Sequence, residues 1–432
     1  MNHLLARKVR STAGKLLIKA NAALLWFRIA KMRHYYPIVM RRLRGKLRSD
    51  EPIKVLFIVT EPAKWKLQSL YDLMAGDSRF HVQIGVSCPD FAGEKNKSDA
   101  LSAFNAACDF FAARNMPTIK LWLPDKATPS KLHRNCADII FYQQVWFDVK
   151  WQMPYDVCKW AISCYIPYFV ANYGDVAMEC LKPLHRLFNY HFVQDEEWKH
   201  LYESALGRVF RVGRMVGLGH PMLDYIEFDP KCGDGKQCVI YAPHWTINPH
   251  NRPGCLNYAT FLWNGREILE YAKRHKEMNW VFKPHPNLAY ILEKFKVMSR
   301  GEIDEYYTAW AQIGRVEMSG DYHRLFNESS SLVTDCGSFL TEYVVTGKPI
   351  IHLISATCTH KPLASSSFLY PTYYQARSLD EMYSLFSSIL ERREDPKRNV
   401  RVSALRKAIC VEGKAASRIL NFILDEIAGK AG

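Results

Sequence analysis

Residues 239–353 contain five short motifs that share one arrangement. In chain order they are VIYAPHW (239–245), FKPHP (282–286), DYHRLF (321–326), TDCGS (334–338) and GKPIIHL (347–353). Most begin in or just after a short β-branched run, which predicts that their polar and glycine residues lie at strand ends. Open parallel sheets bind their ligands at that edge. The motifs therefore predict an α/β domain with a ligand site, and their residue types indicate a nucleotide diphosphate.

The FKPHP motif supplies two candidate ligands for the diphosphate. Pro284 and Pro286 restrict the backbone on either side of His285, and Lys283 adds a positive charge beside it. The alternative interpretation is a proline-stiffened surface turn with an incidental histidine. A role in binding the diphosphate is favoured because the motif follows a predicted strand at 280–282, and binding and catalytic residues are frequent at strand ends.

The TDCGS motif lies between a predicted strand at 331–333 and a helical segment at 339–345. A helix that begins there would present backbone amides to a phosphate oxygen, although its first serine is also a common helix cap. Acidic side chains suit a sugar, polyol or ribose hydroxyl better than a phosphate. The donor-binding candidates in this region are Thr334, Asp335, Gly337, Ser338 and Glu342.

His244 ends the first strand of the same domain and is a candidate catalytic residue. The unperturbed pKa of histidine lies near neutral pH, so a neutral imidazole there could take a proton from an attacking hydroxyl. The competing interpretation is a packed, hydrogen-bonded histidine beside Trp245. His323 and His352 are interpreted as structural.

Several common enzyme classes are excluded because their motifs are missing. The sequence has no P-loop, no Gly-x-Gly-x-x-Gly after the first strand, no Gly-x-Ser-x-Gly and no His-Glu-x-x-His. It also lacks Asp-x-Asp, and its 12 cysteines include no Cys-x-x-Cys pair, so neither zinc spacing nor a small disulfide framework is present. We expect a metal-independent reaction without a cofactor, in a cytosolic protein with reduced cysteines.

The net charge of +15 is concentrated at the N-terminus. Residues 1–49 hold 13 Lys and Arg and no acidic residue, which leaves 45 basic against 43 acidic residues in the rest of the chain. A nearly neutral body argues against a nucleic-acid-binding protein. The alternative interpretation of residues 1–49 is an ordinary basic helix that packs on its own protein or binds nucleic acid nonspecifically.

The basic arm is predicted to be an amphipathic helix. Its apolar residues recur largely at steps of three and four, with Leu24 and Trp26 beside a stripe of Leu5, Val9, Leu16, Ala20, Ala23 and Phe27. The longest uncharged run, 20–27, is far shorter than the ~20 residues of a membrane span, and no signal cleavage site follows. We expect residues 1–48 to hold the protein peripherally on an anionic membrane.

Short apolar strands alternate with helical segments through two ranges, 53–228 and 237–400, and predict two α/β domains. The arm (1–50) precedes them, and residues 401–432 form a C-terminal closing helix that ends at Gly429. Strands of the first domain are predicted at 54–60, 81–86, 119–123, 137–142, 160–166, 191–193 and 212–216, and a helix at 64–75.

Taken together, the five motifs resemble the CDP-glycerol:poly(glycerophosphate) glycerophosphotransferase family, the teichoic-acid type polyol-phosphate transferases. The resemblance is best over 239–353. It is weaker at 190–198 (YHFVQDEEW), 219–224 (GHPMLD) and 412–419 (EGKAASRI), and it covers about half of the chain. The family resemblance implies a GT-B-like fold, in which two Rossmann-like domains face each other across a cleft and the second holds the nucleotide.

The resemblance further implies an enzyme on the cytoplasmic side of the membrane that transfers a polyol phosphate from a CDP-activated donor and releases CMP. Donor-site roles would fall on Lys283 and His285 at the diphosphate, and on the TDCGS residues at the nucleotide or polyol. One departure concerns the catalytic base. The family usually offers Trp-His-Gly in its first domain, whereas this chain has CYIPYF at 164–169. His244 and Tyr168 are the two candidate replacements.

The expected donor is CDP-glycerol or CDP-ribitol, and the expected acceptor is a lipid-linked glycan or surface polymer. The alternative is a GT-B glycosyltransferase that uses a nucleotide-sugar, because it needs the same diphosphate site. The sequence distinguishes neither the polyol nor the acceptor, and it does not separate a single addition from polymerisation.

Overall fold

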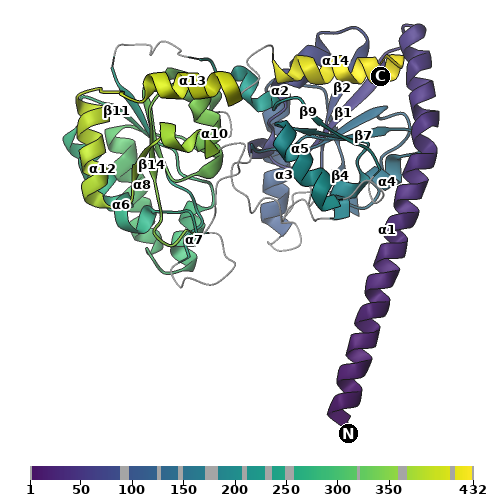
Figure 1. Cartoon of the computed structure of the whole chain (residues 1–432), viewed down its shortest axis with the longest axis horizontal. Helices are drawn as coiled ribbons and strands as arrows, with labels where there is room; N and C mark the ends of the chain where they lie inside the picture. Colours follow the sequence, from purple (N-terminus) through teal and green to yellow (C-terminus); the bar gives the residue numbers. More distant parts are fainter. Residues whose placement is uncertain are drawn as a thin grey trace. The chain divides into compact units, whose positions relative to one another are not determined.

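The structure is a computed structural model that describes residues 2–87, 97–123, 128–144, 149–170, 183–206, 212–228, 236–248, 257–318, 322–358, 367–408 and 414–430. Contacts between residues divide the chain into two compact units. Unit 1 comprises Met1–Tyr168, Ala177–His220 and Ala416–Gly432, and unit 2 comprises Phe169–Val176 and Pro221–Ala415. Each unit is built on a parallel sheet covered by helices (Figure 1).

In the described part of unit 1, seven strands form a sheet in the order β3-β2-β1-β6-β7-β8-β9, and every neighbouring pair is parallel. The strands are β1 (Ile53–Val59), β2 (Phe80–Val86), β3 (Thr118–Lys120), β6 (Ile139–Tyr142), β7 (Ile162–Tyr165), β8 (Tyr190–Val193) and β9 (Arg214–Gly217). The strand expected at 119–123 is split, since β4 (Trp122–Leu123) instead pairs antiparallel with β5 (Thr128–Pro129).

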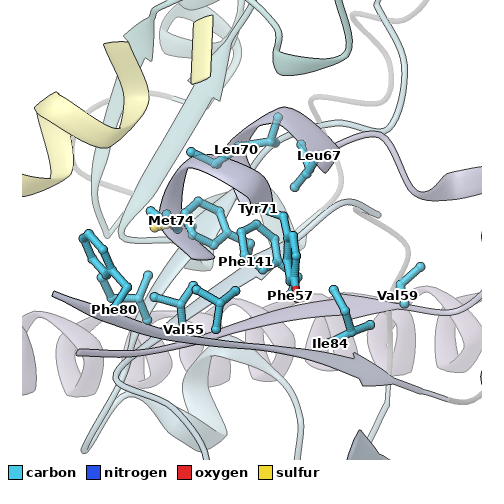
Figure 2. Close-up of a cluster of buried hydrophobic side chains, with 14 of the residues drawn as sticks. Val55, Phe57, Val59, Leu67, Leu70, Tyr71, Met74, Phe80, Ile84 and Phe141 are labelled. Atoms are coloured by element: carbon cyan, nitrogen blue, oxygen red, sulfur yellow. The ribbon is translucent and has the colours of Figure 1, made fainter. Parts of the chain in front are cut away.

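Apolar side chains from β1 and β2 pack against the short helix α2 (Gln68–Ala75) to form one core of unit 1 (Figure 2). On β1, Phe57 is fully buried and stacks on Phe141 with ring centroids 4.7 Å apart. The helix contributes Leu70 and Met74, both without exposed surface. Burial on both faces explains why β1 has a continuous apolar sequence instead of an alternating one.

The helices of unit 1 that connect the strands are short. They are η1 (Pro62–Lys64), α2 (Gln68–Ala75), α3 (Lys97–Ala112), α4 (Pro154–Val157), η4 (Pro183–Leu187) and α5 (Glu196–Leu206). The helix predicted at 64–75 begins four residues late, because the 3₁₀ turn η1, with its proline at the first position, ends at Lys64 and the chain is extended at Trp65.

Both ends of the chain are helices of unit 1. The arm is one helix, α1 (Asn2–Arg48), whose C-terminal half buries Ile29, Met32, Val39 and Leu43 in the unit's cores. The closing helix α14 (Ala415–Ala428) buries its apolar face in the core that also receives Leu43, and Gly429 follows it in the left-handed region at φ +76°. No described helix is long and apolar enough to cross a membrane.

A hydrogen-bonded chain of side chains joins these two helices to the sheet. The hydroxyls of Tyr36 on α1 and Tyr190 on β8 lie 2.6 Å apart, and Tyr190 donates to Glu426 of α14 at 2.8 Å. Arg214 on β9 pairs with the same glutamate at 2.5 Å. The α1 helix is therefore integrated into unit 1 through its second half.

Among the described residues of unit 2, six parallel strands lie in the order β12-β11-β10-β13-β14-β15. They are β10 (Cys238–Ala242), β11 (Asn279–Phe282), β12 (Arg315–Val316), β13 (Ser331–Thr334), β14 (Ile350–Leu353) and β15 (Tyr374–Ala376). This is the strand order of a Rossmann-like domain, and the direction of winding reverses between β10 and β13. The α/β fold with two Rossmann-like sheets is confirmed.

Helices cover the sheet of unit 2 (Figure 1). They are η5 (Pro221–Tyr225), α6 (Phe261–Arg274), α7 (Leu288–Lys294), α8 (Arg300–Ile313), α9 (His323–Glu328), α10 (Gly337–Tyr343), η6 (Val344–Thr346), η7 (Tyr370–Thr372), α12 (Leu379–Leu385), the π-helical η8 (Phe386–Glu391) and α13 (Arg398–Ala408). Phe282 of β11 stacks on Trp310 of α8 at 5.0 Å, and both side chains are fully buried. This packing fixes β11, and the start of the motif that follows it, against α8.

Candidate functional site

Three of the five motifs lie at the carboxyl ends of β10, β11 and β13, around the point where the winding of unit 2 reverses. His244 follows β10, Lys283 and His285 follow β11, and Asp335 follows β13, and these three strands are neighbours. All three strands are parallel, so the motifs lie at the same carboxyl edge of the sheet. A crevice at a reversal of strand order is where open α/β sheets bind their ligands. The topology thus places the predicted diphosphate ligands together.

Backbone hydrogen bonds continue the β10–β11 pairing into the two loops. The Lys283 amide donates to the Tyr241 carbonyl at 2.8 Å, and the His285 amide donates to the Pro243 carbonyl at 3.1 Å. The rings of His244 and His285 consequently lie side by side, with centroids 5.2 Å apart and planes at 72°. The two predicted histidines form one pair, although 40 residues of sequence separate them.

His285 is a neutral hydrogen-bond donor. Its Nδ1 accepts the backbone N–H of Asn287 at 3.1 Å, which leaves the ring proton on Nε2. Burial, with a smaller contribution from the charge of Lys283, lowers the pKa of His285 to about 4. At neutral pH the side chain therefore offers an N–H group without a positive charge.

Lys283 is a buried cation, with 6% of its surface exposed. Its ammonium lies 5.2 Å from the centre of the Tyr322 ring, and the Tyr322 hydroxyl donates to Glu342 at 2.6 Å. Burial lowers the pKa of Lys283, while the charges of Glu317 and Glu342 oppose that shift. Glu342 is itself buried, so in this structure its carboxylate contacts the Tyr322 hydroxyl and is not at the surface.

Asp335 connects three separate segments of unit 2. One carboxylate oxygen accepts the backbone N–H of His244 at 2.6 Å. The other accepts the backbone N–H and the hydroxyl of Thr260 at 2.5 and 2.8 Å. Burial raises the pKa of Asp335 to about 6, against the lowering effect of these hydrogen bonds. In this structure the side chain aligns the residues around it.

The remaining TDCGS residues differ in accessibility. Thr334 is fully buried, and its hydroxyl donates to the Ala242 carbonyl at 2.6 Å while accepting the Cys336 N–H at 3.0 Å. Gly337 begins α10, and Ser338 is partly exposed with its hydroxyl 3.4 Å from the Cys336 sulfur. Ser338 is therefore the TDCGS side chain best able to meet a ligand, and the assigned donor-binding roles stay predictions.

Tyr168, the other candidate base, belongs to unit 1. It follows β7, its amide donates to the Gln143 carbonyl at 3.2 Å, and its side chain is partly exposed. All the other predicted site residues belong to unit 2, so the structure gathers them without Tyr168. Its catalytic role stays a prediction.

Sequence reasoning missed Thr246, Tyr258, Thr260 and Tyr322. Tyr322 lies inside the DYHRLF motif, so the motif itself was the signal. The two threonines and Tyr258 have no such signal, because an isolated threonine in a loop has no distinctive pattern and only folding brings it to His244 and Asp335. In the described ranges, no cluster of three or more His, Cys, Asp or Glu residues could hold a metal ion.

Comparisons with known proteins give a likeness in structure only. No protein-family model matches the sequence, and no curated protein matches it either. Among solved structures, the wall teichoic acid polymerase TagF, in a structure obtained with CDPG, is 12% identical with a TM-score of 0.54, over 94% of this chain and 99% of that one. The UDP-GlcNAc 2-epimerase from Neisseria meningitidis, bound to UDP-GlcNAc, is 11% identical with a TM-score of 0.52, over 86% of this chain and 100% of that one.

These neighbours are enzymes of the GT-B type, and they match nearly the whole length of the chain. At such low identity the likeness concerns the fold and leaves the substrate open. TagF, which the motif resemblance of residues 239–353 anticipates, is among the structural neighbours. The chain thus has a GT-B-like fold of two Rossmann-like domains, with its predicted diphosphate ligands at the ligand-binding edge of the second.

Proposed function

We propose that this protein transfers glycerol phosphate or ribitol phosphate from its CDP derivative to a membrane-associated glycan or polymer, and releases CMP. The observation that carries the proposal is the meeting of Lys283, His244 and His285 at the carboxyl ends of β10 and β11, next to the reversal point of the unit 2 sheet. The resemblance of the surrounding motifs to CDP-glycerol transferases supports the choice of donor. The likeness to TagF in fold supports it as well.

In the proposed reaction the acceptor hydroxyl attacks the phosphorus next to the polyol. A new oxygen–phosphorus bond forms, and the bond from that phosphorus to the bridging oxygen breaks. The electron pair leaves with CMP, and the proton of the hydroxyl passes to a general base. Lys283 and His285 stabilise the negative charge that develops on the departing phosphate, and no metal or cofactor takes part. Thr334, Asp335, Gly337, Ser338 and Glu342 complete or support the donor site.

The proposed place of action is the cytoplasmic side of the membrane, with α1 as the attachment. Leu24, Phe27 and Ile38 have 48%, 67% and 51% of their surface exposed, whereas Ile29 and Leu43 face the core of unit 1. Helical geometry puts Phe27 and Ile38 on the face opposite to Leu43. An exposed apolar face on a helix rich in Lys and Arg suits an anionic bilayer, where each cation contributes about 1 kcal/mol.

A donor panel tests the proposed reaction. Purified protein with membrane acceptor would be incubated separately with CDP-glycerol, CDP-ribitol and a set of UDP-sugars, with and without excess EDTA. We expect CMP release from a CDP-polyol only, and no loss of activity with the chelator. Release of UDP from a UDP-sugar would instead support the alternative, a GT-B glycosyltransferase. The structural neighbour bound to UDP-GlcNAc is the reason to include UDP-sugars in the panel.

Substitution of His285 by alanine tests its role in catalysis. We expect the turnover number to fall roughly 100- to 1,000-fold, the usual effect of removing one charge-stabilising donor. The melting temperature should change little, because the ring is partly exposed. His275→Ala is the matched control, since it removes another partly buried imidazole of unit 2 that precedes β11 instead of following it. Full turnover in folded His285→Ala protein would remove the proposed role.

A further inference from the structure

The hydrogen-bond partners of His244 determine which ring nitrogen carries its proton. Nδ1 lies 2.8 Å from the hydroxyl oxygen of Thr246, and it faces the backbone N–H of the same residue at 3.4 Å. Thr246 is 2% exposed, so water cannot easily replace either partner. The proton on His244 must therefore be placed where these buried groups are all satisfied.

Only one arrangement of the protons satisfies the groups around Nδ1. The Thr246 hydroxyl oxygen already accepts the backbone N–H of Tyr258 at 3.1 Å. If Nδ1 is unprotonated, the hydroxyl can donate to it, and the Thr246 N–H also points at a lone pair. If Nδ1 carried the proton, the Thr246 N–H would face another N–H, and the hydroxyl hydrogen would need a different acceptor. The first arrangement puts the His244 proton on Nε2.

His285 has the same arrangement, because its Nδ1 also faces the backbone N–H of the residue two positions later in the chain. Its Nδ1 accepts the N–H of Asn287, as the Nδ1 of His244 accepts from Thr246. Burial lowers the pKa of both histidines, so both rings are neutral at physiological pH. With centroids 5.2 Å apart, the pair offers two N–H donors without positive charge. A departing phosphate needs such donors, whereas a general base needs an unprotonated Nε2.

We infer that Thr246 is a positioning residue that keeps the proton of His244 on Nε2, so that His244 donates a hydrogen bond to the diphosphate of the donor instead of deprotonating the acceptor. The inference rests on the proposed function and refines the site. It adds a residue that no motif marks, and it leaves acceptor deprotonation to a group other than His244.

Nitrogen NMR of the full-length protein tests the tautomer without any substrate. The protein would be labelled with ¹⁵N in the histidine rings, and long-range proton–nitrogen correlations would be recorded near pH 7.5. His244→Gln identifies the His244 signals by their disappearance. We expect a protonated, pyrrole-type Nε2 and an unprotonated, pyridine-type Nδ1 for His244. The reverse assignment would overturn the inference, while CMP release would continue to test the proposed function independently.

Three threonine variants test whether Thr246 sets the tautomer. Thr246→Val should produce a mixture of both tautomers at His244, and Thr246→Ser, which keeps the hydroxyl, should restore the Nε2 form. Thr346→Val is the matched control, because the fully buried Thr346 hydroxyl also donates once and accepts once, to the Tyr343 carbonyl and from the Lys348 N–H. This control should leave the His244 signals unchanged. An unmixed Nε2 tautomer in folded Thr246→Val protein would contradict the role of Thr246.

Kinetics of two His244 variants test what the side chain does. A glutamine side chain retains an N–H donor but cannot act as a base, and leucine retains neither property. We expect His244→Gln to release CMP within about tenfold of the wild-type rate, and His244→Leu to lose roughly 100-fold. Equal losses in both variants, with melting temperatures unchanged, would overturn the assignment of His244 as a hydrogen-bond donor.

Discussion

Lys283 and His285 lie two positions apart, and burial lowers the pKa of both side chains. Burial keeps His285 neutral, with a pKa of about 4. It also lowers the pKa of Lys283, but the negative charges of Glu317 and Glu342 oppose this loss of charge. A diphosphate site benefits from this combination, because one charged group and two neutral donors avoid the repulsion that three adjacent cations would cause.

The lowered pKa of Lys283 predicts how activity depends on pH. The ammonium must be protonated to bind a diphosphate, so kcat/KM should fall as the pH rises through a value below the usual 10.5. The free energy of unfolding should rise over the same range, because the folded state favours the neutral lysine. Lys283→Arg should move the fall in kcat/KM to higher pH, since a guanidinium stays charged. An unchanged alkaline limb in this variant would assign the limb to another group.

At the scale of elements, one carboxylate aligns the ends of β10 and β13 with the start of α6. Asp335→Asn keeps the size of the side chain but turns an N–H₂ group toward a backbone N–H of His244 or Thr260. We expect the free energy of unfolding to fall by about 1–3 kcal/mol, the cost of a buried unsatisfied group. Urea denaturation measures this.

The charge change itself needs a control. Asp304→Asn removes an exposed carboxylate of α8 that pairs with Arg300 on the same helix, and it should alter the free energy of unfolding by less than about 0.5 kcal/mol. A similarly small effect of Asp335→Asn would show that its hydrogen bonds are not needed to hold the three segments.

The α1 helix has two apolar faces with separate predicted roles. Leu24→Glu combined with Phe27→Glu changes exposed side chains and should leave the melting temperature unchanged. Binding to vesicles that contain phosphatidylglycerol should fall more than tenfold, because burial of each apolar side chain is worth about 1.5–3 kcal/mol. Sedimentation with the vesicles measures this loss.

The buried face of the same helix provides the opposite control. Ile29→Ala should lower stability by about 2–5 kcal/mol without weakening vesicle binding, because Ile29 is 3% exposed. Unchanged vesicle binding by the double glutamate variant would refute the membrane role of α1. Deleting residues 1–48 is a poor test, since it would also remove Leu43 from the core of unit 1.

At the scale of the whole molecule, the two ends of the chain belong to one unit. Leu43 of α1 and Ile423 of α14 share a core with the sheet of unit 1, although 380 positions separate them. Ile423→Ala should lower the free energy of unfolding by about 2–5 kcal/mol. Hydrogen exchange should show faster exchange in β8 of unit 1, while β10 of unit 2 stays protected. Leu262→Ala, at an exposed position of unit 2, should affect neither strand.

The sequence by itself determined the class of the fold and the edge where the site lies. Strands such as β1, β2 and β10 were predicted within one or two residues, because a continuous apolar run followed by glycine, proline or a polar residue marks a buried parallel strand. Charge counting likewise located the basic arm, since that pattern is local. The same locality explains the prediction of His285 and Lys283, whose motif directly follows its strand.

Tertiary structure decided the relations between distant segments. It brought His244 to His285, linked the Tyr258 N–H to His244 through the Thr246 hydroxyl, and buried Glu342 as the hydrogen-bond acceptor of Tyr322. It also packed the second half of α1 into unit 1, where Ile29 and Leu43 are buried while Phe27 and Ile38 are exposed. Periodicity identifies an apolar face but not its partner, because the partner is set by which elements lie next to each other in space, and that depends on the topology of the whole chain.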